Sequence, residues 1–315
     1  MSDHEARVVR RLNEEFFSTS PADHFRLRAS VLMQFGDESL PAGSATGDFT
    51  RDVLNRLPGS SLGQEPADPA QQKAALTVES FMLAHHAGES LLRHYLALLD
   101  TRQGGSPWLA LSQLQSGPRF KTCLQGIIEP SGVDDLHEGI GFCFLGDRAA
   151  ITQQLGVEQV SRTVTWVASW LRHFAHFYLD TSNGYNSAKH GLSSLPGHKL
   201  VSFSFAGDAG PEDVPLLRGA SLETLEYKVR GKGAEKQQHW YRMLRTVDPA
   251  GLLAFVIVAA DLLDALWTIG RTHHLGGSCP IQMFDGPTPA DVTTGHGTHW
   301  GALEVPIWTL PQEDR

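Results

Sequence analysis

The stretch that decides the fold is VEQVSRTVTWVASWLRHFAHFYLDTSNGYNSAKHGLS, residues 157–193. Its apolar residues recur at alternating spacings of four and three, the pattern of one face of an α-helix about six turns long. That face consists of Val160, Val164, Val167, Leu171, Phe174 and Tyr178. Trp166, Trp170 and Phe177 widen it, so we expect the helix to be buried on most sides.

A second stripe of the same helix is polar. It runs through Arg162, Trp166, Ser169, His173, His176 and Asp180. Because buried polar groups need partners, this stripe must face water, another polar element or a ligand. The helix is predicted to end at residues 181–184, where Gly184 suits a left-handed cap. Asn186 and His190 follow four residues apart, and they share a face if this turn is helical.

Composition restricts the class of protein. A chain of 315 residues with 41% hydrophobic and 19% charged residues is typical of a folded soluble protein with one large or two small domains. The net charge of -9 argues against a nucleic-acid coat over the whole surface, but it allows a local basic patch. The three cysteines lie far apart and form no CxxC pair, which indicates a reducing compartment.

The N-terminus and the longest apolar run indicate where in the cell the protein is expected. The N-terminus is charged and lacks the pattern of a secretory signal. The apolar run at residues 250–260 is too short to span a bilayer and is interpreted as a core helix. We therefore expect a cytoplasmic protein with no membrane association.

The rest of the chain is predicted to be mostly helical. Helices are expected at residues 4–17, 21–35, 69–100, 107–115, 118–128 and 249–270, several of them opened by Ser-Pro or Asp-Pro. Residues 201–205 and 225–230 alternate with period two, and a third strand-like run follows at 239–245. A further strand is possible at 305–310. The expected fold class is mostly α, a helical bundle with a small inserted antiparallel β-hairpin or sheet.

This pattern divides the chain into four parts. They are an N-terminal helical pair (1–35), a loop or linker rich in Gly, Pro and Ser (36–69), a helical bundle with the β insertion at about 199–247 (70–275), and an irregular C-terminal tail (276–315).

The two long helices carry polar groups, and Asn-x-x-x-His follows the second. This combination resembles the HEPN superfamily, helical-bundle domains of many bacterial toxins and defence proteins. The stretches HHAGESLLRHYLALL (85–99), PWLALSQLQSGPRFK (107–121) and YNSAKHGL (185–192) also look like a group of actinobacterial proteins. The resemblance covers about residues 70–192. It implies a bacterial, RNA-directed role in defence or stress response.

The nucleases of that superfamily carry an Arg followed, after four to six residues, by a His. Asn186 and His190 look like the polar residue after that Arg and the His, while Tyr185 stands in the position of the Arg. RNA cleavage needs a base with a near-neutral pKa and a cation for the phosphate. The candidate catalytic residues are therefore Asn186, Lys189 and His190.

Other polar side chains on the two long helices are candidates for ligand binding. They are His85, His86, Glu89, Arg93, Arg172, His173 and His176. In the alternative interpretation, these groups hydrogen-bond between helices and lock the bundle. The histidine clusters also raise the question of a metal site, but neither helix contains Glu-x-x-His, and we assign no metal. No P-loop, GxGxxG or GxSxG is present, so no cofactor is expected.

The β insertion is basic on an acidic protein. From Lys228 to Arg245 there are six Lys or Arg and one Glu. With aromatic residues among them, this is the mixture that single-stranded nucleic acid favours. The candidate RNA contacts are Lys228, Arg230, Trp240, Tyr241, Arg242 and Arg245. In the alternative interpretation, they form a solvated sheet face.

Three functional hypotheses follow. The first is a HEPN-like module that binds RNA or a nucleotide, with its site between helix 70–100 and the 157–193 segment. The second is a divergent, metal-independent ribonuclease, and the third is a non-catalytic scaffold. RNA or a nucleotide is the expected partner, and a homodimer is possible.

Overall fold

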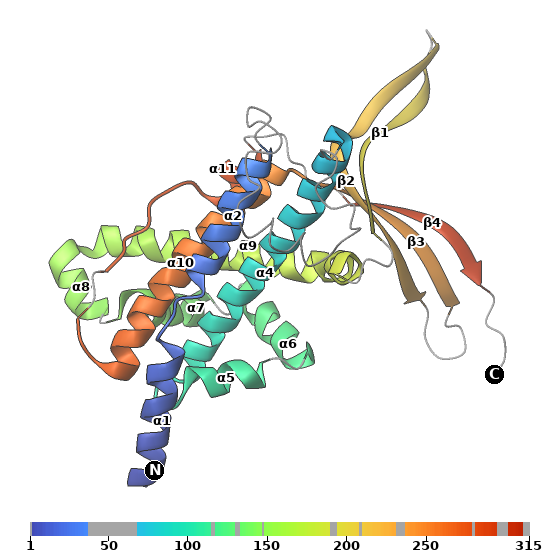
Figure 1. Ribbon diagram of the computed structural model, residues 1–315. Coiled ribbons are helices and arrows are strands. Elements are labelled where there is room, and N and C mark those ends of the chain that lie inside the picture. The colour runs from blue at the N-terminus through green and yellow to red at the C-terminus, as the bar shows by residue number, and fades with distance from the viewer. Residues whose placement is uncertain are drawn as a thin grey trace, which may run out of the picture.

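A computed structural model describes residues 2–36, 68–114, 117–129, 133–146, 148–189, 194–207, 210–230, 237–278, 281–294 and 302–310 (Figure 1). The helices are α1 (Asp3–Phe16), α2 (Ala22–Gly36), α4 (Pro69–Asp100), α5 (Pro107–Gln113), α6 (Gly117–Ile128), α7 (Val133–Ile140), the π-helical η2 (Gly141–Leu145), α8 (Arg148–Leu155), α9 (Val157–Lys189), α10 (Pro249–Leu275) and α11 (Pro289–Thr294). The strands are β1 (Ser194–Gly207), β2 (Gly210–Arg230), β3 (Gln237–Thr246) and β4 (Ala302–Leu310). The expected fold class, mostly α with a small antiparallel sheet, is confirmed.

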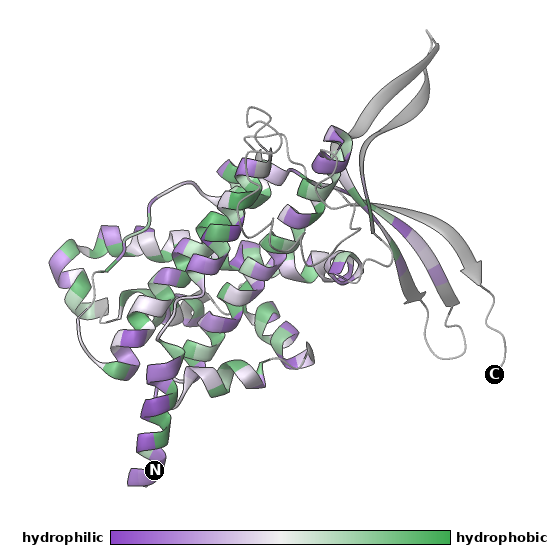
Figure 2. Cartoon of the chain, in the orientation of Figure 1, coloured by the Kyte–Doolittle hydropathy of each residue, from purple (hydrophilic) through white to green (hydrophobic). Residues whose placement is uncertain are grey.

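The core of the bundle forms where α2, α4, α9 and α10 meet. Five of the six residues on the predicted apolar face of α9 are buried, and Tyr178 is half-buried. Gly88 on α4 permits close contact with α9, since a Cβ there would lie 3.1 Å from the Phe174 ring. In Figure 2 the hydrophobic positions concentrate where these helices cross, whereas α1 is mostly hydrophilic.

α10 is the most apolar helix of the described chain. Asp248 caps its start by accepting a hydrogen bond from the Ala250 amide at 3.1 Å, as Asp-Pro predicts. Among the described residues, it is the one helix long and apolar enough to cross a membrane by length and composition, a property that buried core helices share. Here it packs against α4 and α2, and its two aspartates are paired, since Arg26 of α2 lies 2.8 Å from Asp261 and 3.5 Å from Asp264.

The N-terminal helices belong to the same core. Phe17, Ala22, Phe25 and Ala29 are buried in one continuous hydrophobic cluster with α4 and α10. The predicted linker lies almost entirely outside the described residues, which stop at Gly36 and resume at Asp68.

The predicted end of α9 at residues 181–184 is wrong, because the helix continues to Lys189. The hydroxyl of Thr181 donates to the carbonyl of Phe177 at 2.5 Å, and that of Ser182 donates to the carbonyl of Tyr178. The polar side chains are therefore satisfied within the helix. Gly184 does not take a positive φ and instead faces Arg245, whose Nε would lie 3.4 Å from an added Cβ.

The sheet is antiparallel, with strand order β1-β2-β3-β4, and it projects from the bundle beside the start of α4 and the end of α9 (Figure 1). The predicted strands at 201–205, 225–230, 239–245 and 305–310 all fall within it, although β1 and β2 are longer than expected. β4, from the expected C-terminal tail, pairs with β3. Leu222 of β2 is fully buried in the bundle core, so the sheet is anchored there.

Candidate functional site between α2, α4 and α9

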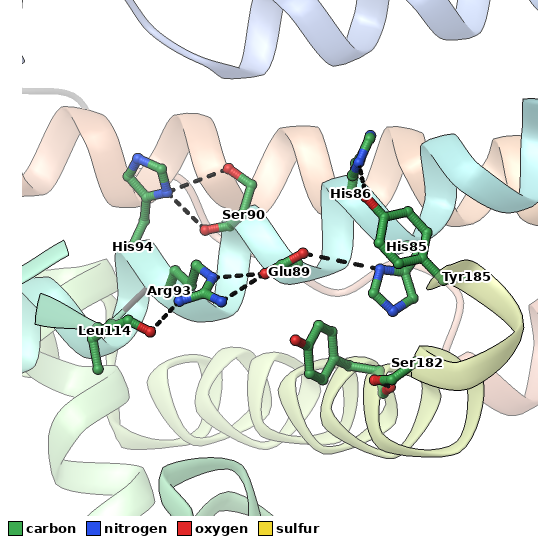
Figure 3. A network of polar contacts seen from close by, with 10 residues as sticks. His85, His86, Glu89, Ser90, Arg93, His94, Leu114, Ser182 and Tyr185 are labelled. Atoms are coloured by element: carbon green, nitrogen blue, oxygen red, sulfur yellow. Dashed lines mark hydrogen bonds and ion pairs between the residues drawn. The ribbon is translucent and has the colours of Figure 1, made fainter. Parts of the chain in front are cut away.

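Polar side chains from α4 meet aromatic and polar side chains from the last third of α9. His85, Glu89 and Arg93 follow one another at intervals of four residues along α4, so they share one face of that helix. Tyr178, Ser182 and Tyr185 lie opposite them on α9 (Figure 3). His85, Glu89 and Arg93 of α4 therefore face this part of α9.

His85 forms the inner part of the site. Its ring is 1% exposed and is stacked on the ring of Tyr185, with centroids 3.9 Å apart and planes 1° apart. Both ring nitrogens lack a hydrogen-bond partner within the described residues. Burial lowers the pKa of His85 from 6.5 to about 3, so the ring is neutral at pH 7. A buried imidazole without partners costs free energy, so the site keeps a polar group that packing alone does not require.

The nearby carboxylate of Glu89 does not keep the His85 ring protonated. Its Oε2 lies 4.0 Å from His85 Nδ1, which is beyond hydrogen-bond distance. Its Oε1 is held by Arg93, at 2.8 Å from Nε and 2.7 Å from Nη2. Because the carboxylate is already compensated by Arg93, burial decides the protonation state of His85.

Arg93 also connects three helices. It donates to the backbone carbonyl of Leu114 at the end of α5, and its guanidinium carbon lies 4.1 Å from the centre of the Phe120 ring on α6. With Glu89 as its ion-pair partner, Arg93 is fully engaged within the protein. The arrangement supports a structural role for Arg93.

The outer part of the site surrounds His86. His86 Nε2 is hydrogen-bonded to the hydroxyl of Tyr185. Burial, followed by the negative charge of Glu89, raises the pKa of Tyr185, so its hydroxyl stays protonated and can donate this bond. Burial, followed by the positive charge of Arg28, lowers the pKa of His86, and Lys189 and His24 act in the same direction. The positive charges of Arg28 on α2 and Lys189 on α9 therefore both act on one imidazole of α4.

The remaining ligand-binding candidates on α9 do not join this cluster. His173 packs edge-on against Trp170 and Phe255 of α10, and burial lowers its pKa to about 4. His176 is exposed. Arg172 is half-buried, and its Nη2 has no partner within the described residues. The helical stripe that suggested these residues points partly towards α10 and solvent.

Of the candidate catalytic residues, Asn186 and Lys189 are exposed in the last turn of α9, and His190 lies outside the described residues. The Nζ atom of Lys189 is 5.8 Å from the centre of the Tyr185 ring. Lys189 thus belongs to the outer part of the site. Tyr185 is 5% exposed, and its hydroxyl is hydrogen-bonded to His86.

The candidate RNA contacts lie on the sheet, apart from this cluster. Arg242 is paired with Glu223, and Arg245 lies 3.3 Å from Glu226. Both glutamates are buried, so these two arginines compensate charges within the protein. Tyr241 is buried and Trp240 is half-buried, while the side chains of Lys228 and Arg230 lie outside the described residues.

Sequence reasoning missed Arg28, His24, Tyr178 and Ser182. Arg28 and His24 were assigned to an ordinary amphipathic helix, whose charged face carries no signal of a site.

Within the described ranges, no group of three or more His, Cys, Asp and Glu side chains is placed to hold a metal ion. Comparisons with protein-family models, with curated proteins and with solved structures find no match.

Proposed function

We propose that this protein is a HEPN-like module that binds RNA or a nucleotide at the junction of α2, α4 and α9. The observation that carries the proposal is the contact of His86 with the Tyr185 hydroxyl, with Lys189 over the Tyr185 ring and the positive charge of Arg28 acting on His86, on a chain whose net charge is -9. Anionic ligands are attracted to such a local cluster even on an acidic protein. The ring nitrogens of His85, which is stacked on Tyr185, have no hydrogen-bond partner in the described part of the chain, and they support the same location.

Binding is tested by fluorescence anisotropy with a labelled single-stranded RNA of mixed sequence at low salt. The expected result is saturable binding that weakens as salt increases, because counterions are released from the RNA backbone. His86→Gln is expected to weaken binding, and His176→Gln, an exposed histidine outside the cluster, is the matched control. Absence of binding, or equal binding by both variants, would favour a scaffold without a ligand at this site.

A divergent ribonuclease is the second candidate. The His86–Tyr185 pair favours it, because a neutral imidazole and a protonated hydroxyl in contact can accept and donate protons next to the cation of Lys189. Incubation of purified protein with total RNA, beside His86→Gln and an Asn186→Ala/Lys189→Gln variant, tests this activity. Identical RNA profiles with the wild-type protein and with buffer would exclude it under those conditions.

A further inference from the structure

The β1–β2 hairpin extends beyond the rest of the sheet as a two-stranded arm. β3 pairs with β2 from Ser221 onward, whereas β1 pairs with β2 as far as Gly207 and Gly210. Within the described chain, residues 199–207 and 210–219 are therefore paired only with each other, and Figure 1 shows this arm pointing away from the helical bundle. Because a two-stranded hairpin alone is marginally stable in water, we expect the arm to gain stability from a further strand.

The arm is amphipathic in its pairing register. Val201, Phe203 and Phe205 alternate along β1, so these positions belong to one face of the ribbon. The positions opposite Val201 and Phe203 on β2 are Leu217 and Val214, which are also apolar. The intervening serines belong to the other face. A strand with this pattern accepts a neighbour in a restricted register, because a slip of one residue would place apolar positions against polar ones.

The two open edges of the arm differ in sequence. On β2, Pro211 and Pro215 have no N–H group to donate, and a proline in a strand is tolerated where its N–H side faces solvent or at a bulge. On β1, residues 199–207 contain no proline, and Lys199 is their one charged residue. Natural sheets protect edge strands with proline and charge, and residues 200–206 carry neither. The outer edge of β1 is therefore the side of the arm that can accept a further strand.

We infer that β1 pairs antiparallel with β1 of a second copy of this chain, which gives a homodimer with a continuous β2-β1-β1-β2 sheet. Pairing centred on Phe203 sets Phe203 opposite its own copy and Val201 opposite Phe205, so apolar residues meet apolar residues. The intervening serines meet each other, and Lys199 meets Gly207, so no like charges oppose. This contact is self-complementary, as the two-fold axis of a dimer requires.

The charge of the arm favours a protein partner over nucleic acid. The charged residues between positions 199 and 219 are Lys199, Asp208, Glu212, Asp213 and Arg218, so the arm is slightly acidic. Binding to a nucleic-acid backbone requires a basic surface. Pairing of one short strand from each copy buries little area, so we expect a dimer that dissociates on dilution, with a dissociation constant on the order of micromolar.

Analytical ultracentrifugation of the full chain over a range of concentrations tests the dimer. Phe203→Lys is expected to raise the dissociation constant at least roughly tenfold, because it opposes two ammonium groups at the axis. Val201→Glu/Phe205→Lys is expected to dimerise, since opposite charges then meet across the interface, whereas Val201→Lys/Phe205→Lys is expected to stay monomeric. A wild-type protein that is monomeric at every concentration, or equal dimerisation of the two double variants, would overturn the inference.

Disulfide formation identifies the strand through which two copies meet. Phe203→Cys is expected to give a covalent dimer on oxidation, in excess of any formed by the wild-type protein with its own three cysteines. Val214→Cys, opposite Phe203 on β2, is the matched control, because three strand spacings, roughly 14 Å, separate it from its copy and a disulfide cannot bridge that distance. Covalent dimers from Val214→Cys and none from Phe203→Cys would show that the arms meet through β2, and the inference would be wrong.

Discussion

The burial of His85 predicts a specific dependence of stability on pH. Folding lowers the pKa of His85 from 6.5 to about 3, because burial disfavours the charged ring. Between these two pKa values the unfolded chain binds a proton that the folded protein excludes. The stability associated with neutral His85 is therefore present above about pH 6.5 and is lost as the pH falls.

The magnitude follows from the two pKa values. At about pH 5 an unfolded histidine is protonated in roughly thirty molecules for each neutral one, which corresponds to about 2 kcal/mol. The folded protein stays neutral at that pH for any pKa of His85 below about 4, so this value does not depend on the depth of the shift. The side chain is 1% exposed, and solvent screening therefore does not reduce the effect.

The assay is urea unfolding of the wild-type protein and of His85→Gln, which does not titrate, at about pH 7.5 and about pH 5. The wild-type protein is expected to lose about 2 kcal/mol more than His85→Gln between these conditions. His173, whose pKa is lowered to about 4, continues to titrate in both proteins and serves as an internal reference. An equal loss in the two proteins would refute the reasoning, since it would mean that folded His85 accepts a proton from solvent or through Glu89.

Three further changes test the packing around the site. Gly184→Ala is expected to leave the free energy of unfolding unchanged or to raise it by up to about 1 kcal/mol, because Gly184 is helical and a Cβ meets only ordinary contacts. Thermal unfolding measures this change, and a left-handed cap at Gly184 would give a loss of stability instead. Gly270→Ala is expected to cost about 1–2 kcal/mol in thermal unfolding, because its Cβ would lie 2.7 Å from Leu98 Cδ2. Arg93→Met is expected to cost about 3 kcal/mol in urea unfolding, and addition of Glu89→Gln should recover much of it; no recovery would disprove their coupling.

Hydrophobic periodicity was sufficient to locate the main helices. The face from Val160 to Phe174 is buried as predicted, because the spacing of apolar residues in a long helix allows few other arrangements. The end of α9 was not predictable in the same way. Thr181, Ser182 and Gly184 are typical of a helix end, whereas in the structure the Thr181 hydroxyl bonds back to the Phe177 carbonyl and Arg245 lies beside Gly184.

The candidate site was predictable from one side only. Histidines and charges in the middle of an apolar helix are conspicuous, so His85, His86, Glu89 and Arg93 could be selected from α4 alone. Their roles differ because of contacts that the sequence does not contain. Arg93 is satisfied by Glu89 and by α5 and α6, whereas both nitrogens of His85 have no hydrogen-bond partner among the described residues.

The position of Tyr185 explains why a motif comparison alone is insufficient for this chain. In the sequence, Tyr185 stands where the resembled nucleases carry an Arg, which suggests a lost cation. In the structure, its hydroxyl contacts His86 while cations lie nearby on α2 and in the last turn of α9. A cation supplied by Arg28 is more than a hundred residues away in sequence, so no local motif can include it. The Tyr beside Asn186 therefore does not leave this part of the structure without positive charge, and the question that decides function is whether that charge binds an anionic ligand.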